Sequence, residues 1–154
     1  MAVRLRILGV ALVALVIASP AFAGAALPVL PGSPSVHYNI EPLVRPVSIE
    51  YAGDGSGALG GFDGHGRNRF GHLTWTKWTT EVAIGHGANW VDDCMPACAD
   101  GIFHPYLAEL TAFRPRDGHF TRLRVRSGRG PNAVTFTLAV QGSGRHLIYQ
   151  DLPG

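Results

Sequence analysis

Both cysteines of the chain lie in one short stretch that also contains acidic and histidine side chains. The stretch VDDCMPACADGIFHPY contains Cys94 and Cys98, with Asp92 and Asp93 before them and His104 after them. Such side chains can bind a transition metal, a pair of thiols can act as a redox couple, and two cysteines can form a disulfide bond. Which chemistry applies depends first on the compartment that the chain occupies.

The N-terminus predicts export from the cell. Arg4 and Arg6 precede an apolar run over residues 7–18, and residues 21–23 (Ala-Phe-Ala) supply the small side chains that a signal peptidase needs. The run is shorter than the roughly 20 residues of a membrane-spanning helix. We therefore predict that residues 1–23 are a cleaved signal peptide and that the protein is secreted, either released or associated with the cell wall. The chain has no second apolar run that would predict an integral membrane anchor.

The charge of the chain gives no argument for a nucleic-acid partner. The formal net charge of +2 comes from 13 basic and 11 acidic residues. Two of the basic residues, Arg4 and Arg6, belong to the signal peptide, so the mature chain is formally neutral. The charges are nevertheless unevenly distributed, because residues 114–154 contain seven arginines and only two acidic residues.

The rest of the chain predicts one small all-β domain. Residues 24–35 are rich in proline and are expected to form an extended leader before a single domain over residues 36–154. Apolar residues come in short runs with period two, and none shows a sustained helical spacing. We expect a compact β-sandwich or small β-barrel. Eight strands are expected, over residues 36–41, 47–51, 73–80, 81–91, 106–113, 119–127, 133–141 and 146–150.

One hairpin can be predicted in detail, around Asp117-Gly118. This dipeptide favours a two-residue type I′ turn, because both central positions need positive φ. The turn would place Leu110, Ala112, Leu123 and Val125 on the core face. It would pair Arg116 with His119, Phe113 with Arg122, Thr111 with Arg124 and Glu109 with Arg126.

The same register predicts a row of arginines on the outer face. We call Arg122, Arg124 and Arg126 the arginine ridge; they would lie about 7 Å apart along the strand. The ridge could bind phosphate or an anionic polymer. The alternative is a solvated outer face of a half-exposed sheet, partly neutralised by Glu109.

The cysteine pair is interpreted as a disulfide, because paired cysteines in a secreted chain usually form one. The bridge would close a very small loop and contribute only about 2 kcal/mol, so it would fix a loop rather than hold the fold. A zinc site is the alternative, with His86 and His104 completing the ligands, but the C-x3-C spacing is unusual for zinc. The C-x-x-C spacing of redox enzymes is absent. We expect no metal and no cofactor.

The remaining candidate motifs predict no catalytic site. The glycine-rich region Gly53–Gly71 lacks the spacing of a calcium loop and is expected to be a flexible loop. Neither G-x-S-x-G nor H-E-x-x-H occurs. Trp75 and Trp78 could form a platform that stacks sugars, or could pack in the core. A regular strand would place these two tryptophans on opposite faces.

Five elements of the sequence together resemble a family of small secreted actinobacterial proteins of mycobacterial type. The family pattern is L-T-W-x-x-W, then A-x-G-x-G, then C-x-P-x-C-A-x-G, followed by a tyrosine strand and F-T-R-L. Here these motifs are Leu73-Thr74-Trp75 with Trp78, Ala83-Gly85-Gly87, Cys94-Pro96-Cys98-Ala99-Gly101, Tyr106 and Phe120-Thr121-Arg122-Leu123. The resemblance covers about half of the mature chain. It implies secretion, a compact β domain and a Cys94–Cys98 bridge, and it assigns no catalytic residue.

The sequence therefore predicts a secreted or cell-envelope protein that binds a partner without enzymatic chemistry. An anionic glycan or another envelope component would bind at the arginine ridge or at loops. The candidate binding loops are the region Gly53–Gly71 and the loop that contains Asp92, Asp93 and His104. One alternative is a metal-dependent enzyme that uses His86 with these three residues. The other is a purely structural envelope protein.

Overall fold

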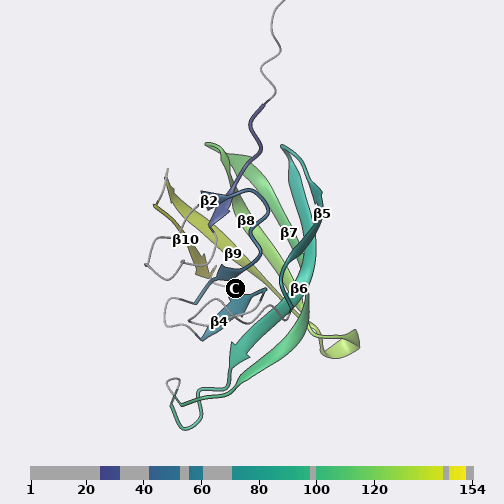
Figure 1. Cartoon of the computed structure of the whole chain (residues 1–154), viewed down its shortest axis with the longest axis vertical. Coiled ribbons are helices and arrows are strands. Elements are labelled where there is room, and N and C mark those ends of the chain that lie inside the picture. The colour runs from purple at the N-terminus through teal and green to yellow at the C-terminus, as the bar shows by residue number, and fades with distance from the viewer. Residues whose placement is uncertain are drawn as a thin grey trace, which may run out of the picture.

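The computed structural model describes residues 25–31, 42–52, 56–60, 71–97, 100–143 and 146–151. In this part of the chain almost every regular element is a β-strand, and one antiparallel sheet of eight strands curls into a half-barrel (Figure 1). The strand order is β10-β9-β8-β7-β6-β4-β3, and β5 pairs with the part of β6 that β4 does not reach. The expected all-β fold is confirmed. The single curled sheet is closer to the small barrel than to a two-layer sandwich.

The strands differ greatly in length. The described elements are β1 (Leu30–Pro31), β2 (Pro42–Leu43), β3 (Ile49–Glu50), β4 (Gly57–Leu59), β5 (Thr74–Trp78), β6 (Val82–Asp92), β7 (Phe103–Arg116), β8 (His119–Ser127), a 3-10 turn at Gly130–Asn132, β9 (Val134–Ser143) and β10 (His146–Asp151). Six of the eight expected strands overlap β5 to β10. The expected strand over 47–51 corresponds to the shorter β3. The expected strand over 36–41 lies outside the described residues.

The hairpin formed by β7 and β8 has the register that the turn predicted. Asp117 and Gly118 have φ values of 50° and 80°, as a type I′ turn requires. Thr111 lies opposite Arg124 and Glu109 opposite Arg126, and the other two expected pairs are also present. The four residues expected on the core face are buried.

Strand β4 corrects one expectation from the sequence. It lies inside the region Gly53–Gly71, which was expected to be a flexible loop. Ala58 and Leu59 are fully buried between β3 and β6. The ring of Tyr51 packs directly against Gly57, because a Cβ at this position would lie only 2.6 Å from that ring. Small and apolar residues can therefore form a buried strand within a glycine-rich stretch.

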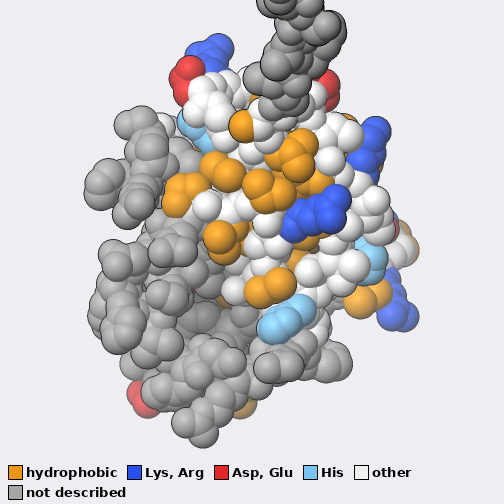
Figure 2. Space-filling model, turned by 45° about the horizontal axis from the view of Figure 1, so that its top comes forward, with side chains coloured by type: hydrophobic (Ala, Val, Ile, Leu, Met, Phe, Trp, Pro, Cys, Tyr) orange, Lys and Arg blue, Asp and Glu red, His pale blue; other side chains and the backbone are white. Residues whose placement is uncertain are grey.

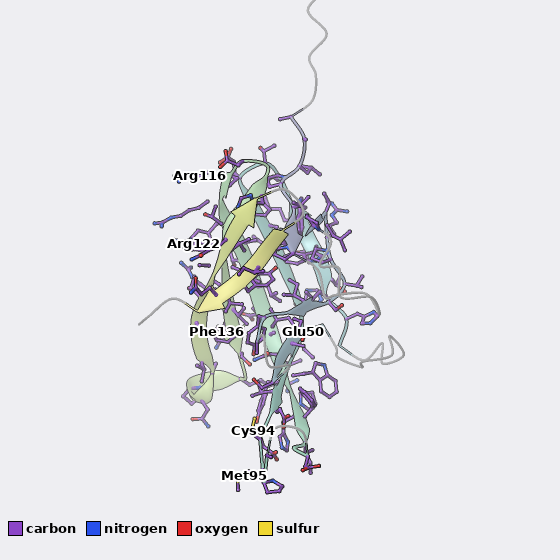
Figure 3. All side chains as sticks on the ribbon, turned by 90° about the vertical axis from the view of Figure 1, so that its left-hand side faces the viewer. Glu50, Cys94, Met95, Arg116, Arg122 and Phe136 are labelled. Atoms are coloured by element: carbon purple, nitrogen blue, oxygen red, sulfur yellow. The ribbon has the colours of Figure 1, made fainter. Side chains whose placement is uncertain are left out.

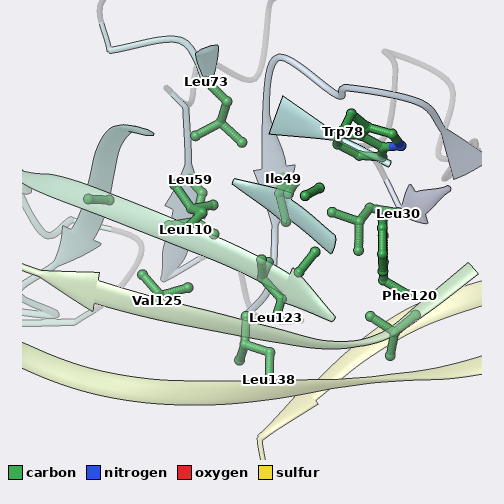
Figure 4. Close-up of a cluster of buried hydrophobic side chains, with 14 residues drawn as sticks. Leu30, Ile49, Leu59, Leu73, Trp78, Leu110, Phe120, Leu123, Val125 and Leu138 are labelled. Atoms are coloured by element: carbon green, nitrogen blue, oxygen red, sulfur yellow. The ribbon is translucent and has the colours of Figure 1, made fainter. Parts of the chain in front are cut away.

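The core fills the concave side of the half-barrel. Its buried side chains come from the sheet and from the N-terminal part of the chain that lies across it (Figure 4). Among the largest fully buried residues, Leu30 comes from this N-terminal part, Ile49 from the edge strand β3, and Phe120, Leu123 and Leu138 from β8 and β9. The core therefore depends on segments that are distant in the sequence.

Residues 28–31, which we call the N-terminal strap, are integral to this core. The backbone of Val29 bonds to the start of β8, donating to the Gly118 carbonyl at 3.0 Å and accepting from the Phe120 N–H at 3.1 Å. The Tyr149 hydroxyl donates to the carbonyl of Pro31 at 2.9 Å. These residues of the predicted leader pack inside the domain. The domain therefore begins before residue 36, where the sequence suggested its start.

Trp75 and Trp78 lie on the same side of β5 and not on opposite faces as a regular strand predicts. The register against β6 shifts between Trp75 and Lys77, which is a β-bulge that adds one residue. The two rings meet edge to face, with centroids 4.7 Å apart. The Trp75 indole N–H donates to the carbonyl of Pro46, and that of Trp78 donates to the carbonyl of Pro28. These tryptophans thus pack into the domain and do not form an exposed platform for sugars.

Among the described residues, the chain has no helix that is long and apolar enough to cross a membrane.

Candidate binding surfaces

The arginine ridge lies on the convex outer face of the half-barrel. It comes from β8, which runs between β7 and β9. Leu123 and Val125 are fully buried on the inner face, and alternation along the strand places the arginines between them on the outer face. Figure 3 shows the side chain of Arg122 pointing away from the sheet. The structure therefore places the ridge as the sequence predicted.

Each arginine of the ridge has a contact on the outer face. Arg126 lies 3.6 Å from the carboxylate of Glu109, and both side chains are exposed. The guanidinium of Arg124 lies 5.2 Å from the centre of the Phe113 ring. Arg122 donates to the carbonyl of Thr121 at 2.8 Å. Because exposed ion pairs contribute roughly 0–1 kcal/mol, the pairing with Glu109 leaves Arg126 able to bind a ligand at little cost.

The side chains around the ridge leave this face with a surplus of positive charge. Cross-strand partners on the outer face are mainly threonine and aliphatic residues, with Lys77 and His86 at the β5–β6 side. Glu109 is the only acidic residue among the described residues that pair, across β5 to β9, in register with the three arginines. A stretch of the sheet with four cationic side chains and one carboxylate attracts anions.

The expected binding loop lies at the far end of the β6–β7 hairpin, where Figure 3 labels Cys94 and Met95. Asp93 accepts from the backbone N–H of Met95 at 3.1 Å and of Ile102 at 3.0 Å. Its second oxygen lies 3.1 Å from Nε2 of His104. The structure thus brings Asp93 and His104 together, but both act on the loop itself.

Asp92 has a similar role in the same loop. Its side chain is buried, and one oxygen accepts from the backbone N–H of Cys94 at 3.0 Å. Gly101 lies directly against this carboxylate, and a Cβ there would collide with it. The presence of glycine at this position therefore has a steric reason. The two aspartates thus hold the hairpin tip through hydrogen bonds to its backbone.

The hydrogen bonds to Asp93 lower the pKa of its carboxyl below the ordinary 3.8. The largest cause is the bond from the Ile102 amide, followed by the contact with His104 and the bond from Met95. Hydrogen bonds to a carboxylate favour its charged form. Asp93 is therefore ionised throughout the neutral range.

The ligands of the alternative metal site do not come together. His86 lies opposite Glu109, whereas His104 lies opposite Val91, five residues further along β6. This separation is about 17 Å along the strand. In the part of the chain that the structure describes, no group of three or more His, Cys, Asp or Glu residues could hold a metal ion.

Two expectations fall partly outside the described residues. Cys98 is not described, so the Cys94–Cys98 bridge stays a prediction. Of the region Gly53–Gly71, only residues 56–60 and Gly71 are described.

The structure also shows a surface that the sequence reasoning missed. Leu27, Leu43, Val44 and Val47 are exposed aliphatic residues that flank the N-terminal strap and the segment between β2 and β3. We call these four residues the N-terminal apolar patch. Figure 2 shows hydrophobic side chains gathered beside the N-terminal segment, around a basic side chain. The sequence does contain a signal for this surface in the stretch PLVRPV. Its apolar residues do not alternate with polar ones, as those of a half-buried strand do.

Comparisons with known proteins find no relative. No family model matches the chain, and no curated protein or solved structure is significantly similar to it. The resemblance to the actinobacterial family therefore remains a prediction from its motifs.

Proposed function

We propose that the protein is a secreted or cell-envelope module that binds an anionic polymer, such as an acidic glycan, on its arginine ridge. The proposal includes export by residues 1–23 and a Cys94–Cys98 bridge at the hairpin tip. It involves no enzymatic chemistry. The observation that carries it is the alignment of three arginines on an outer face with a single described carboxylate.

The chemistry of the ridge suits a repeating anion. Guanidinium groups pair with carboxylate, sulfate or phosphate through two parallel hydrogen bonds. Alternate residues of a strand lie about 7 Å apart, so a linear polymer along β8 can meet successive arginines. The threonines that flank the ridge, Thr111, Thr135 and Thr137, offer hydroxyl groups to the same ligand.

The test compares two variants that lose the same charge. The Arg124→Ser/Arg126→Ser variant removes two members of the ridge. The Arg116→Ser/Arg129→Ser variant removes two exposed arginines from the end of β7 and the β8–β9 connection. We would measure the affinity of the mature protein for heparin and for polyphosphate at several salt concentrations.

The proposal predicts a difference between these variants. The ridge variant should bind about tenfold more weakly, which corresponds to roughly 1.4 kcal/mol, and its salt dependence should be shallower. The control variant should keep the affinity of the wild type, and both should unfold at an unchanged temperature. Equal losses in the two variants would overturn the proposal. If the wild type binds neither polymer, the structural role becomes the better interpretation.

A further inference from the structure

The N-terminal apolar patch is unusually exposed for a cluster of aliphatic residues. The exposed fractions are 40% for Leu27, 42% for Leu43, 44% for Val44 and 55% for Val47. Single exposed aliphatic residues are ordinary, but a contiguous cluster marks an interaction surface. The four residues belong to two adjacent segments, because β1 and β2 pair directly through Leu30 and Leu43.

The backbone that carries the patch is held firmly in place. Pro46 is buried, and its carbonyl accepts the indole N–H of Trp75 at 2.8 Å. The carbonyl of Val47 accepts the backbone N–H of Leu73 at 2.8 Å. The residue opposite Leu43 in the β1–β2 pair is Leu30, whose side chain is fully buried in the core. The exposed side chains are therefore presented by a fixed segment.

A single arginine lies within this apolar segment. Arg45 is exposed and has a φ of 57°, in the left-handed region that non-glycine residues rarely adopt. In residues 42–52 the only acidic residue is Glu50, and burial raises the pKa of its carboxyl. Among the side chains that Figure 2 colours by type, the acidic ones lie at the rim of this face. In the described residues 42–47 the aliphatic side chains thus surround one positive charge and no carboxylate.

We propose that the N-terminal apolar patch binds the surface of a lipid bilayer that carries anionic headgroups. The aliphatic side chains would enter the boundary between headgroups and acyl chains, and Arg45 would pair with a lipid phosphate. Binding of this kind combines buried apolar area with attraction between basic side chains and anionic lipid. It is peripheral and reversible, and it needs no membrane-spanning segment.

The path of the chain argues for a bilayer as the partner. The described chain starts at Ala25, beside the patch, and the apolar run over residues 7–18 precedes it. Residues 19–26 can span at most about 28 Å when fully extended. Until residues 1–23 are cleaved, an apolar run held in a membrane therefore keeps this face of the domain within reach of the headgroups, and cleavage leaves the mature N-terminus beside the patch. The inference rests on the proposed export by residues 1–23, but not on the binding proposed for the arginine ridge, which lies on the convex face.

The experiment measures sedimentation of the mature protein with phosphatidylcholine vesicles, with and without phosphatidylglycerol. The patch variant is Leu43→Ser/Val44→Ser. Its matched control is Ile84→Ser/Val134→Ser, which replaces two aliphatic residues of β6 and β9 that are exposed to 41% and 63%. We expect the patch variant to partition at least tenfold more weakly into vesicles containing phosphatidylglycerol. The control should behave like the wild type.

Two further variants separate this inference from its alternatives. Arg45→Ser should abolish the preference for phosphatidylglycerol while leaving weak binding to both vesicles, and it keeps every core residue in place. Arg124→Ser/Arg126→Ser should leave vesicle binding unchanged. If the ridge variant abolishes binding instead, the headgroups bind the ridge and the inference is wrong.

Two other results would overturn the inference. One is absence of wild-type binding to either vesicle, and the other is an equal loss of binding in the Ile84→Ser/Val134→Ser control. Sedimentation equilibrium without lipid tests a second copy as the partner. If the wild type dimerises and the patch variant does not, while neither binds vesicles, the patch is an interface between copies of this chain.

Discussion

At the scale of single residues, the carboxylates near the cysteines serve the backbone. Asp92 and Asp93 drew attention because metal sites and catalytic sites use such side chains. In the structure they accept hydrogen bonds from amides of Cys94, Met95 and Ile102. The sequence contained a signal for this role, because aspartate often caps the amide two residues later in a turn. The bond to Ile102 spans nine residues and needs the closed hairpin, so local patterns could not predict it.

The lowered pKa of Asp93 makes a prediction about acid. Because the folded loop favours the charged carboxylate, Asp93 stabilises the loop fully at pH values above the ordinary pKa of 3.8. This stabilisation is lost as the pH falls through the lower pKa that Asp93 has in the folded state. Titration of the Asp93 carboxyl by NMR should give a midpoint below 3.8. The protection of the Ile102 amide from hydrogen exchange should decrease over the same range.

Two substitutions check this assignment. Asp93→Asn should reduce the protection of the Ile102 amide several-fold at neutral pH and remove its dependence on acid, because a neutral amide accepts hydrogen bonds more weakly than a carboxylate does. His104→Gln should raise the carboxyl midpoint only in part, since the amide of Ile102 is the larger cause. An Asp93 midpoint at or above 3.8 in the wild type would contradict the geometry.

At the scale of elements, local chemistry predicted the central hairpin but not the irregular strands. The β7–β8 register follows from Asp117-Gly118 and from alternation on both sides, which are properties of adjacent residues. The bulge in β5 has no comparable signal, because it is fixed by pairing with β6 and by two indoles that reach the carbonyls of Pro28 and Pro46. Strand β4 was missed for a similar reason, since its burial depends on both β3 and β6.

The turn of this hairpin makes a prediction about Gly118. Its φ of 80° is unfavourable for residues with a Cβ, but an added Cβ would meet no atom within 4 Å. Any loss of stability must therefore come from the backbone and not from a clash. Gly118→Val should destabilise the domain by about 1–2 kcal/mol. Gly118→Asn should cost less, because asparagine tolerates the left-handed region.

Urea unfolding of both variants measures this difference. The dependence of the free energy of unfolding on urea concentration should stay unchanged, because the turn is exposed in the native state and the core is intact. If the two variants lose the same stability, side-chain tolerance of positive φ is not what the turn requires.

At the scale of the whole molecule, the main path of the curled sheet ends at β3 and β10, and the N-terminal part of the chain joins these two strands. Strand β1 contacts β10 and pairs with β2, which leads to β3. The strap also bonds to β8 and to Trp78 of β5. The sequence predicted an all-β chain but not this closure, because proline-rich composition indicates extended structure without showing what it packs against. The domain then has its proposed lipid-binding surface beside the N-terminal end of the described chain and its arginine ridge on the convex face.

This arrangement makes the strap part of the folding unit, and two leucines of the N-terminal segment test it. Leu30 is fully buried, whereas Leu27 is 40% exposed three residues earlier. Leu30→Ala should lower the free energy of unfolding by about 2–5 kcal/mol, as for other buried leucines. Leu27→Ala should change it by no more than about 0.5 kcal/mol. Urea unfolding of the mature protein measures both values. Hydrogen exchange adds a local readout, because the Phe120 amide donates to the Val29 carbonyl and should lose protection only with Leu30→Ala. Equal stabilities of the two variants would mean that the strap lies on a domain that is already complete, and the extended leader of the sequence prediction would be restored.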